Sequence, residues 1–287
     1  MSTLLLHFDG QLAKDNRVSM RTLGKSIIHL QNAYDRAFIE QHYGELWKHA
    51  RMKSADYQKV ELLYDQIEIG SFRITFKNLD ELIELLTRRI RGAVQEAFEA
   101  DFEEGDYNLS QLKDQAIRRK EQIQNGAVFP VAYDESTILG DNAVVRRYGD
   151  RAIVREINQA LATVRSKSSG DSTIGFEFGV PNSTMEFHFD REAAVKFNKV
   201  VSRRTLGEPI IYTGRIEGLS KRNLKGEVTL NVTGKTCNLW FADETALNKV
   251  IPGFEGNLDI IFYGSPILEY GAFDPEAGDV FFVDILV

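Results

Sequence analysis

A series of short segments in which apolar and polar residues alternate fills the chain after residue 207. Alternation of this kind predicts strands that bury every second side chain. The predicted strands are residues 210–217, 227–232, 236–241, 258–263, 267–270 and 280–286. One helical segment, residues 243–250, interrupts the series after its third strand. The pattern therefore predicts an independent β domain over residues 207–287.

Three strands, a helix and then further strands is the order of the OB-fold, a small and partly open β-barrel. A related small barrel would give the same pattern. OB-folds bind single strands or sugars through a strand face and particular loops. The loop between the first two strands is one of these, and here residues 219–226 carry Lys221, Arg222 and Lys225. These three cations are candidate contacts for a phosphate backbone or for a partner protein.

The charge of the predicted barrel opposes a nucleic-acid ligand. Residues 208–287 hold six basic and twelve acidic residues, a formal charge of −6 within a chain of −7. Exposed acids within about 8 Å weaken the attraction of the loop for a polyanion at physiological salt. A polyanion would therefore meet a mixed field. A solvated or protein-docking loop is the alternative interpretation of residues 219–226.

Residues 1–206 mix amphipathic helices with alternating strands and predict an α+β platform, an antiparallel sheet with packed helices. Around Gly70, residues 60–67 and 71–76 predict a hairpin followed by a helix. Strands, a turn and a capped helix recur between residues 173 and 201. We interpret this recurrence as a hint of two similar half-units, residues 1–125 and 150–206.

Two further basic features of the platform are candidate contacts. Arg73 lies on the polar side of the alternating segment GSFRITF. Arg118, Arg119 and Lys120 follow one another in a strongly polar helical segment, which makes residues 113–120 a basic helix. These four residues complete the candidate set for binding a partner or nucleic acid.

No group of residues predicts a catalytic or metal site. His42, Glu45 and His49 would share a helix face if the first helix ran that far, but their spacing matches no metalloprotease signature. The residues GDST at 170–173 resemble a serine hydrolase block but precede a strand, and a loop is the better interpretation. Asp65, Glu68 and Glu177 lie on predicted strands without the lysine of a restriction-type nuclease site, and we interpret each as a solvated strand residue.

Composition limits the remaining classes. Cys237 is the single cysteine, which excludes an intrachain disulfide, and we interpret it as a small buried hydrophobe. Phosphate-binding and dinucleotide-binding glycine loops are absent from the sequence, so we expect no cofactor and no metal. No segment approaches the roughly 20 apolar residues that cross a bilayer, and the first residues lack the features of a secretory signal. We expect a cytoplasmic protein.

The segment LHFDGQLAKDNRVSMRTLGKSIIHLQNAYDRA, together with IEIGSFRITF, resembles an N-terminal domain of poorly characterised bacterial proteins, some of them from mobile or anti-phage loci. The resemblance covers about a third of the chain, and that group has no catalytic motif to carry over. It implies a non-enzymatic part of a bacterial defence or mobile-element system.

We therefore expect a non-catalytic binding or assembly protein that acts through protein–protein contacts, with a partner protein or with its own copies. The first alternative is nucleic-acid binding through the barrel loop and the basic helix. The second is a hydrolase or nuclease whose site is assembled from distant acids.

Overall fold

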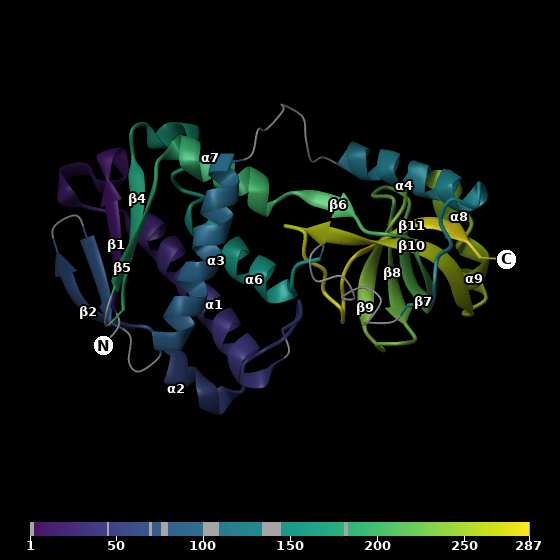
Figure 1. Cartoon of the computed structure of the whole chain (residues 1–287), viewed down its shortest axis with the longest axis horizontal. Coiled ribbons are helices and arrows are strands. Elements are labelled where there is room, and N and C mark those ends of the chain that lie inside the picture. The colour runs from purple at the N-terminus through teal and green to yellow at the C-terminus, as the bar shows by residue number, and fades with distance from the viewer. Residues whose placement is uncertain are drawn as a thin grey trace. The chain divides into compact units, whose positions relative to one another are not determined.

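The computed structural model describes residues 3–44, 46–68, 71–75, 80–99, 109–133, 145–180 and 183–286. The chain divides into two compact units, Met1–Asp101 with Gly149–Ser202 (unit 1) and Phe102–Tyr148 with Arg203–Val287 (unit 2) (Figure 1). Unit 1 is an antiparallel sheet with packed helices and unit 2 contains a closed barrel, so the predicted α+β class is confirmed. The segment around residues 109–124, which we expected in the platform, belongs to unit 2.

Unit 1 is built on a five-stranded sheet with the order β2-β3-β1-β4-β5, in which every neighbouring pair is antiparallel. The hairpins β2–β3 and β4–β5 flank the first strand of the chain, and each hairpin is followed by a helix. These two helices, α3 and α7, pack against each other. The strands are β1 (Thr3–Asp9), β2 (Leu63–Glu68), β3 (Ser71–Thr75), β4 (Thr173–Val180) and β5 (Ser183–Phe189).

Helix ends in unit 1 follow the capping residues of the sequence. The Ser19 hydroxyl accepts a hydrogen bond from the Thr22 amide at the start of α1, and Gly44 ends this helix with a left-handed φ of 75°. Asp190 caps α7 in the same way. The helices of unit 1 are η1 (Gly10–Asn16), α1 (Met20–Tyr43), η2 (Ser54–Asp56), α2 (Tyr57–Val60), α3 (Asp80–Glu99), α6 (Tyr148–Ala160), η3 (Lys167–Ser169) and α7 (Arg191–Val201).

Unit 2 contains a closed barrel with the strand order β7-β8-β9-β11-β10, and β10 returns to β7. The contact between β9 and β11 is parallel and the others are antiparallel. Strand β6 pairs antiparallel with the last residues of β10. The elements are β6 (Arg204–Leu206), β7 (Ile210–Ser220), β8 (Lys225–Leu230), β9 (Thr236–Trp240), α8 (Glu244–Asn248), α9 (Ile251–Glu255), β10 (Asp259–Glu269) and β11 (Val280–Ile285). This is the OB-like barrel that the strand pattern predicts.

The long strand β10 pairs with three strands, β6, β7 and β11, because it bends at Gly264. A Cβ atom at this position would lie 2.6 Å from the Val280 side chain and 3.0 Å from the Tyr212 ring, so only glycine fits. The register with β11 shifts between Tyr263 and Gly264. We predicted two strands here, residues 258–263 and 267–270; the structure has one bent strand, because the bulge keeps the ladder continuous through the turn signals.

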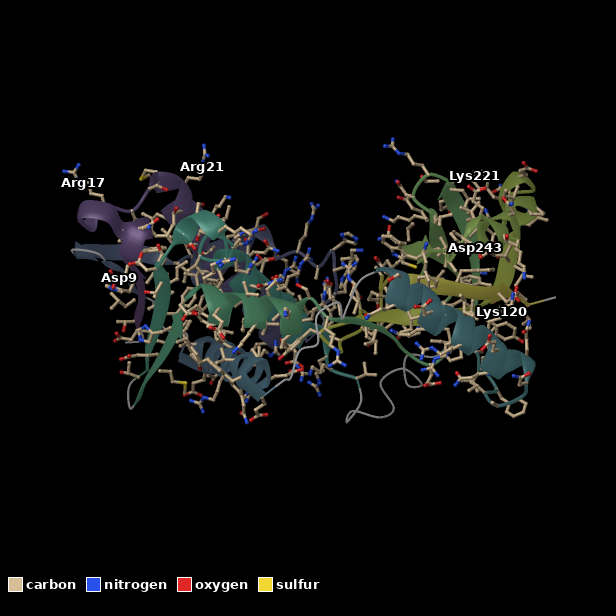
Figure 2. All side chains as sticks on the ribbon, turned by 90° about the horizontal axis from the view of Figure 1, so that it is seen from above. Asp9, Arg17, Arg21, Lys120, Lys221 and Asp243 are labelled. Carbon is tan, nitrogen blue, oxygen red and sulfur yellow. The ribbon has the colours of Figure 1, made fainter. Side chains whose placement is uncertain are left out.

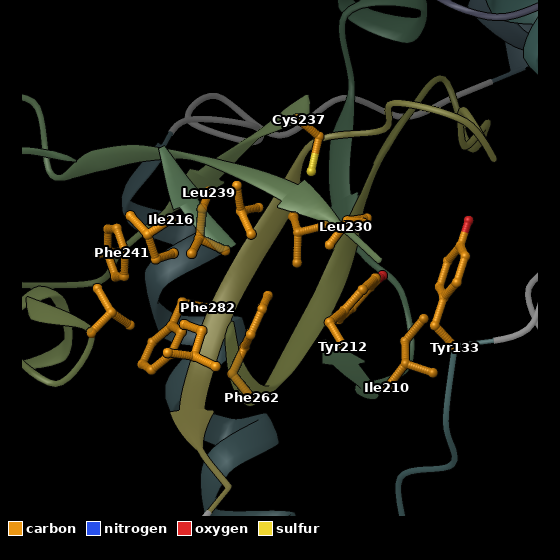
Figure 3. Close-up of a cluster of buried hydrophobic side chains, with 14 of the residues drawn as sticks. Tyr133, Ile210, Tyr212, Ile216, Leu230, Cys237, Leu239, Phe241, Phe262 and Phe282 are labelled. Carbon is orange, nitrogen blue, oxygen red and sulfur yellow. The ribbon is translucent and has the colours of Figure 1, made fainter. Parts of the chain in front are cut away.

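The barrel interior is filled by aromatic and aliphatic side chains from all five strands (Figure 3). The Phe262 ring lies with its centroid 5.5 Å from that of Tyr212 and 5.9 Å from that of Phe282. Cys237 is buried in the same cluster, as the sequence predicts. These contacts make the barrel interior a packed hydrophobic core.

Helix α4 (Leu109–Gln124) packs against the outside of the barrel. Its residues Leu112 and Ala116 bury Leu206 and Phe281, which point away from the barrel interior. The outer surface of β11 is therefore covered by a helix. None of the helices described is long and apolar enough to cross a membrane.

Candidate functional site

The sheet of unit 1 has one face covered by helices and one open face. Strand β1 alternates half-buried and buried residues along its length, and β4 and β5 continue the pattern. The buried side chains are Leu4, Leu6, Phe8, Ile174, Phe176, Phe178, Phe187 and Phe189. The opposite positions on β1, β4 and β5 include Leu5, His7, Glu177, Glu186 and His188, which are half-buried or exposed. We call this set the open face.

A small residue at the centre of the open face makes room for a histidine. Gly175 lies between His7 of β1 and His188 of β5 in the register of the sheet. A Cβ atom on Gly175 would lie 3.2 Å from His188 Nδ1 and 3.5 Å from His7 Cβ. The imidazole of His188 therefore lies over the glycine, with its Nε2 atom 3.3 Å from Glu186 Oε2. A larger residue at 175 would displace this ring.

Strand β5 forms one edge of the sheet. It is the last strand in the order, so among the residues described no strand pairs with its outer side. The side chains of Glu186 and His188 are 57% and 67% exposed, and both belong to the open face. Edge strands carry unpaired backbone donors and acceptors that can pair with another chain. The open face and the β5 edge together form the candidate site.

The predicted basic loop lies between β7 and β8 of the barrel. Lys221 and Arg222 are exposed, and neither forms an ion pair with any residue in the part of the chain that the structure describes. Lys225 is committed to the barrel wall, since its ammonium group lies 5.3 Å from the centroid of the Trp240 ring. Of the three predicted cations, two are free to meet a ligand.

The outer face of β8 and β9 has few free cations or open aromatic rings that could bind a polyanion among the residues described. Trp240 is half-buried under Lys225 and against α4, and its Nε1 atom donates to Asp279. Asp279 also accepts from the Asn238 side chain at 2.9 Å. Glu227 is exposed and lies opposite Asn238. An indole held in this way is not an open platform on which a base could stack.

The basic residues of α4 are largely neutralised by acids of the barrel. Arg119 binds Glu208 at 2.7 Å, and Lys120 binds Asp284 at 3.1 Å. Lys249, which follows the last residue of α8, contacts the same Asp284 carboxylate. Arg118 is exposed, and its one hydrogen bond within the described part of the chain is to the carbonyl of Asp114, four residues earlier. Figure 2 shows Lys120 on α4 well apart from Lys221, so the two predicted basic groups do not form one patch.

Burial and ion pairing have opposite effects on the Asp284 carboxyl. Partial burial acts to raise its pKa, but the hydrogen bonds from Lys249 and Lys120 outweigh burial and lower it. The carboxylate therefore stays charged at neutral pH and keeps both ammonium groups occupied. The basic residues Arg119 and Lys120 thus bind α4 to acids of the barrel. This role could not be read from the sequence, because Asp284 and Lys249 lie far along the chain.

Arg73 lies in β3 opposite Leu5 of β1. Its side chain lies outside the part of the molecule that the structure describes, as do those of Asp65 and Glu68. Glu177 of the open face is described and is half-buried opposite Leu5 and Glu186. A nuclease site formed by Asp65, Glu68 and Glu177 therefore lies outside the described residues for two of its three acids.

The histidines near the end of α1 take part in ring contacts. The helix ends at Tyr43, so His49 does not share a helix face with His42. His42 stacks on Phe38 with centroids 4.9 Å apart, and His49 lies edge-on to Trp47. Glu45 lies outside the described residues. Among those described, no three histidine, cysteine or acidic side chains gather as metal ligands do.

The serine of the GDST segment has a structural contact. Ser172 is fully buried; its hydroxyl accepts from the Leu12 amide at 2.9 Å and donates to the Ser169 carbonyl. A buried hydroxyl with both bonds made is not poised to attack a substrate. His29, which has no acid near it in sequence, lies 2.7 Å from Glu156 of α6. The sequence gives no signal for that pair, which needs the packing of α1 against α6.

One pocket of about 230 Å³ lies beside α4. It is lined by α4, the segment after β9, α8 and β11, with Ala116, Ala246 and Phe282 among its apolar residues. It is smaller than the roughly 300 to 1,000 Å³ typical of ligand sites. Lys120 and Lys249 also line it, and both are already bound to Asp284.

Comparisons of the chain with protein-family models, with curated proteins and with solved structures give no match. The relation to OB barrels therefore rests on the strand order alone.

Proposed function

We propose that this protein is a non-catalytic binding and assembly protein that acts through protein–protein contacts made by the sheet of unit 1. The observation that carries the proposal is the burial pattern of β1, β4 and β5, which leaves the open face and one strand edge exposed. The face mixes Leu5 with the charged residues Glu177 and Glu186. A surface of mixed apolar and charged residues suits a protein partner.

Electrostatics favours a protein over a polyanion as the partner. Glu177 and Glu186 lie opposite each other on the open face, and the barrel residues 208–287 carry a formal charge of −6. Two of the seven basic side chains that we predicted as contacts, Arg119 and Lys120, are paired with acids. A setting in a bacterial defence or mobile-element system follows only from the sequence resemblance, and a cytoplasmic location only from the sequence features given above; both belong to the proposal.

Co-expression with each protein encoded beside this gene tests the proposal. We expect one of these proteins to co-purify with the full chain, and Glu177→Lys to weaken that binding by about tenfold, since it reverses a charge at the centre of the open face. Lys221→Glu with Arg222→Glu is the matched control on the barrel and should leave the binding unchanged. Binding that is lost in the barrel variant and kept in Glu177→Lys would contradict the proposal.

A second candidate function is nucleic-acid binding by the loop between β7 and β8. The observation in its favour is that Lys221 and Arg222 are exposed and have no ion pair among the residues described. Gel shifts with single- and double-stranded DNA and RNA at several salt concentrations test it. Affinity that falls steeply with salt and disappears in Lys221→Glu, Arg222→Glu would establish this function. Absence of binding at low salt would exclude it.

A further inference from the structure

The edge of β5 has a sequence that is complementary to itself. Within residues 185–189, Met185, Phe187 and Phe189 lie on the helix-covered face, and Glu186 and His188 lie on the open face. The acid and the imidazole are one residue to either side of Phe187. In an antiparallel pair, residues equally distant from the centre lie opposite each other. An acid and a base placed in this way would meet their opposites on a second copy.

We infer that the chain forms a homodimer in which β5 pairs antiparallel with β5 of a second copy, around a two-fold axis at Phe187. The inference rests on the proposed assembly function and names a second copy as one partner of the sheet. The two five-stranded sheets join into one continuous sheet, with the helices of both copies on the same side. The backbone groups on the outer edge of β5 then gain partners.

Two requirements fix the register between the two β5 strands. Paired residues must lie on the same face of the sheet, and like charges must not lie opposite each other. A shift of one residue along the strand would place open-face residues against the buried layer. A two-fold axis at Glu186 places this acid opposite itself. An axis at His188 places Glu186 opposite Asp190 of the second copy. Directly opposed like charges destabilise a strand pair, so both registers are disfavoured.

The axis at Phe187 gives favourable pairs on both faces. On the open face, Glu186 of each copy lies opposite His188 of the other, and an imidazole N–H can donate to the carboxylate. On the covered face, Phe187 meets Phe187 and Met185 meets Phe189. Opposite cross-strand Cβ atoms are about 5 Å apart, within reach of all these side chains. The strand that now holds Glu186 and His188 within 3.3 Å in one chain offers the same two groups to its copy.

Charge exchange in the full-length chain tests the register. In the His188→Glu variant, the new acid of each copy lies opposite Glu186 of the other copy, so the dimer contains two acid–acid pairs. We expect its dissociation constant to rise by about tenfold or more. Adding Glu186→Lys to that variant restores opposite charges in both pairs, and affinity should return to within about threefold of the wild type. Because both side chains are exposed, neither change should alter the melting temperature by much.

Sedimentation velocity and light scattering from about 1 to 200 µM supply the measurement, since a small interface predicts weak affinity. Glu227→Lys is the control, because it reverses an exposed charge on β8 of the barrel, in unit 2 and not on the sheet that carries β5. It should leave the dimer unchanged. In the wild type, backbone amides of β5 should exchange with deuterium more slowly at high protein concentration than at low concentration.

A wild-type chain that stays monomeric over this range would overturn the inference, as would a dimer indifferent to His188→Glu. Weakening by His188→Glu without rescue by the double variant would also overturn it, because the register would then be wrong. If the monomeric chain still binds a protein encoded beside its gene, the dimer fails and the proposed function stands. If the dimer forms as expected and no such protein binds through Glu177, the dimer stands without that part of the proposed function.

Discussion

Unit 1 and unit 2 solve the problem of exposed strand edges differently. The barrel joins β10 to both β7 and β11, so its ladder has no open side among those five strands. The sheet of unit 1 ends at β5 among the residues described, and the side chains of its open face on β1, β4 and β5 are half-buried or exposed. Closure uses up the backbone groups that could pair with another chain, whereas an open sheet keeps them. The contrast explains why we locate assembly in unit 1 and only a loop candidate in unit 2.

The two units also differ in what their buried layers contain. The barrel is filled by apolar and aromatic side chains, with Phe262 between Tyr212 and Phe282. Unit 1 ties three helices together with an ionic cluster, in which Arg89 of α3 binds Glu40 of α1 at 2.5 Å and Asp150 of α6 at 2.8 Å. A closed barrel can be held by packing alone, whereas helices that share one side of a sheet are here aligned by charge.

The largest effect that separates the two units should come from Phe262→Ala. The ring is fully buried, and its loss leaves a cavity that costs about 3 to 5 kcal/mol of unfolding free energy in unit 2. The chain has two tryptophans, Trp47 in unit 1 and Trp240 in unit 2. Denaturation followed by Trp240 fluorescence in a Trp47→Phe background therefore reports on the barrel.

Ile261→Ala, the outward-facing neighbour, is the control and should cost about 1 kcal/mol or less. Equal costs would mean that the barrel is not held by its interior.

A somewhat smaller effect, confined to unit 1, should follow from Arg89→Ala. The arginine side chain is 10% exposed, and its removal leaves Glu40 and Asp150 as partly buried acids without a basic partner among the residues described. We expect a loss of about 3 kcal/mol in denaturation followed by Trp47 fluorescence in a Trp240→Phe background. Arg88→Ala removes the exposed neighbour on the same helix and should have little effect. A similar loss in both variants would show that the charge cluster does not hold the helices.

The smallest effect concerns pH and again belongs to unit 1. Hydrogen bonds from Lys59 and then from Tyr43 lower the pKa of Asp56. The stability that the charged form gives is present above the unfolded pKa of about 3.9 and is lost as pH falls through the lower folded value. Asp56→Asn should therefore melt at a lower temperature than the wild type at pH 7, and the gap should close below about pH 4. Glu61→Gln, exposed in the same segment, should show no gap. A gap for Asp56→Asn that persists unchanged at pH 3 would contradict this account.

Local patterns predicted much of the architecture. The alternation in residues 173–189 gave the β4–β5 hairpin and the capped helix that follows it, and the order of strands around one helical segment gave the barrel. Each signal acts within a few residues of the chain, where steric preference, capping and side-chain alternation decide the conformation. The burial of Cys237 was predictable for the same reason.

Pairings between distant residues were not predictable. The sequence of residues 109–124 does not show that Lys120 pairs with Asp284. We therefore predicted that this helix would contact a partner through its basic side chains, although acids of the barrel neutralise two of them. The alternation in TMEFHF shows which side chains share a face, but the strand order decides that β5 is an edge. Asp150 and Glu40 are separated by the chain that forms much of unit 1, and only packing brings them to Arg89.

The interleaved course of the chain has a consequence for biosynthesis. Helix α4 is translated before the last helices and strands of unit 1, but the barrel strand that buries its Leu112 and Ala116 is among the last segments made. At 5 to 20 residues per second the ribosome needs roughly ten to thirty seconds to reach β11. During that interval α4 emerges with its apolar side uncovered, which makes it a segment to which a chaperone can bind.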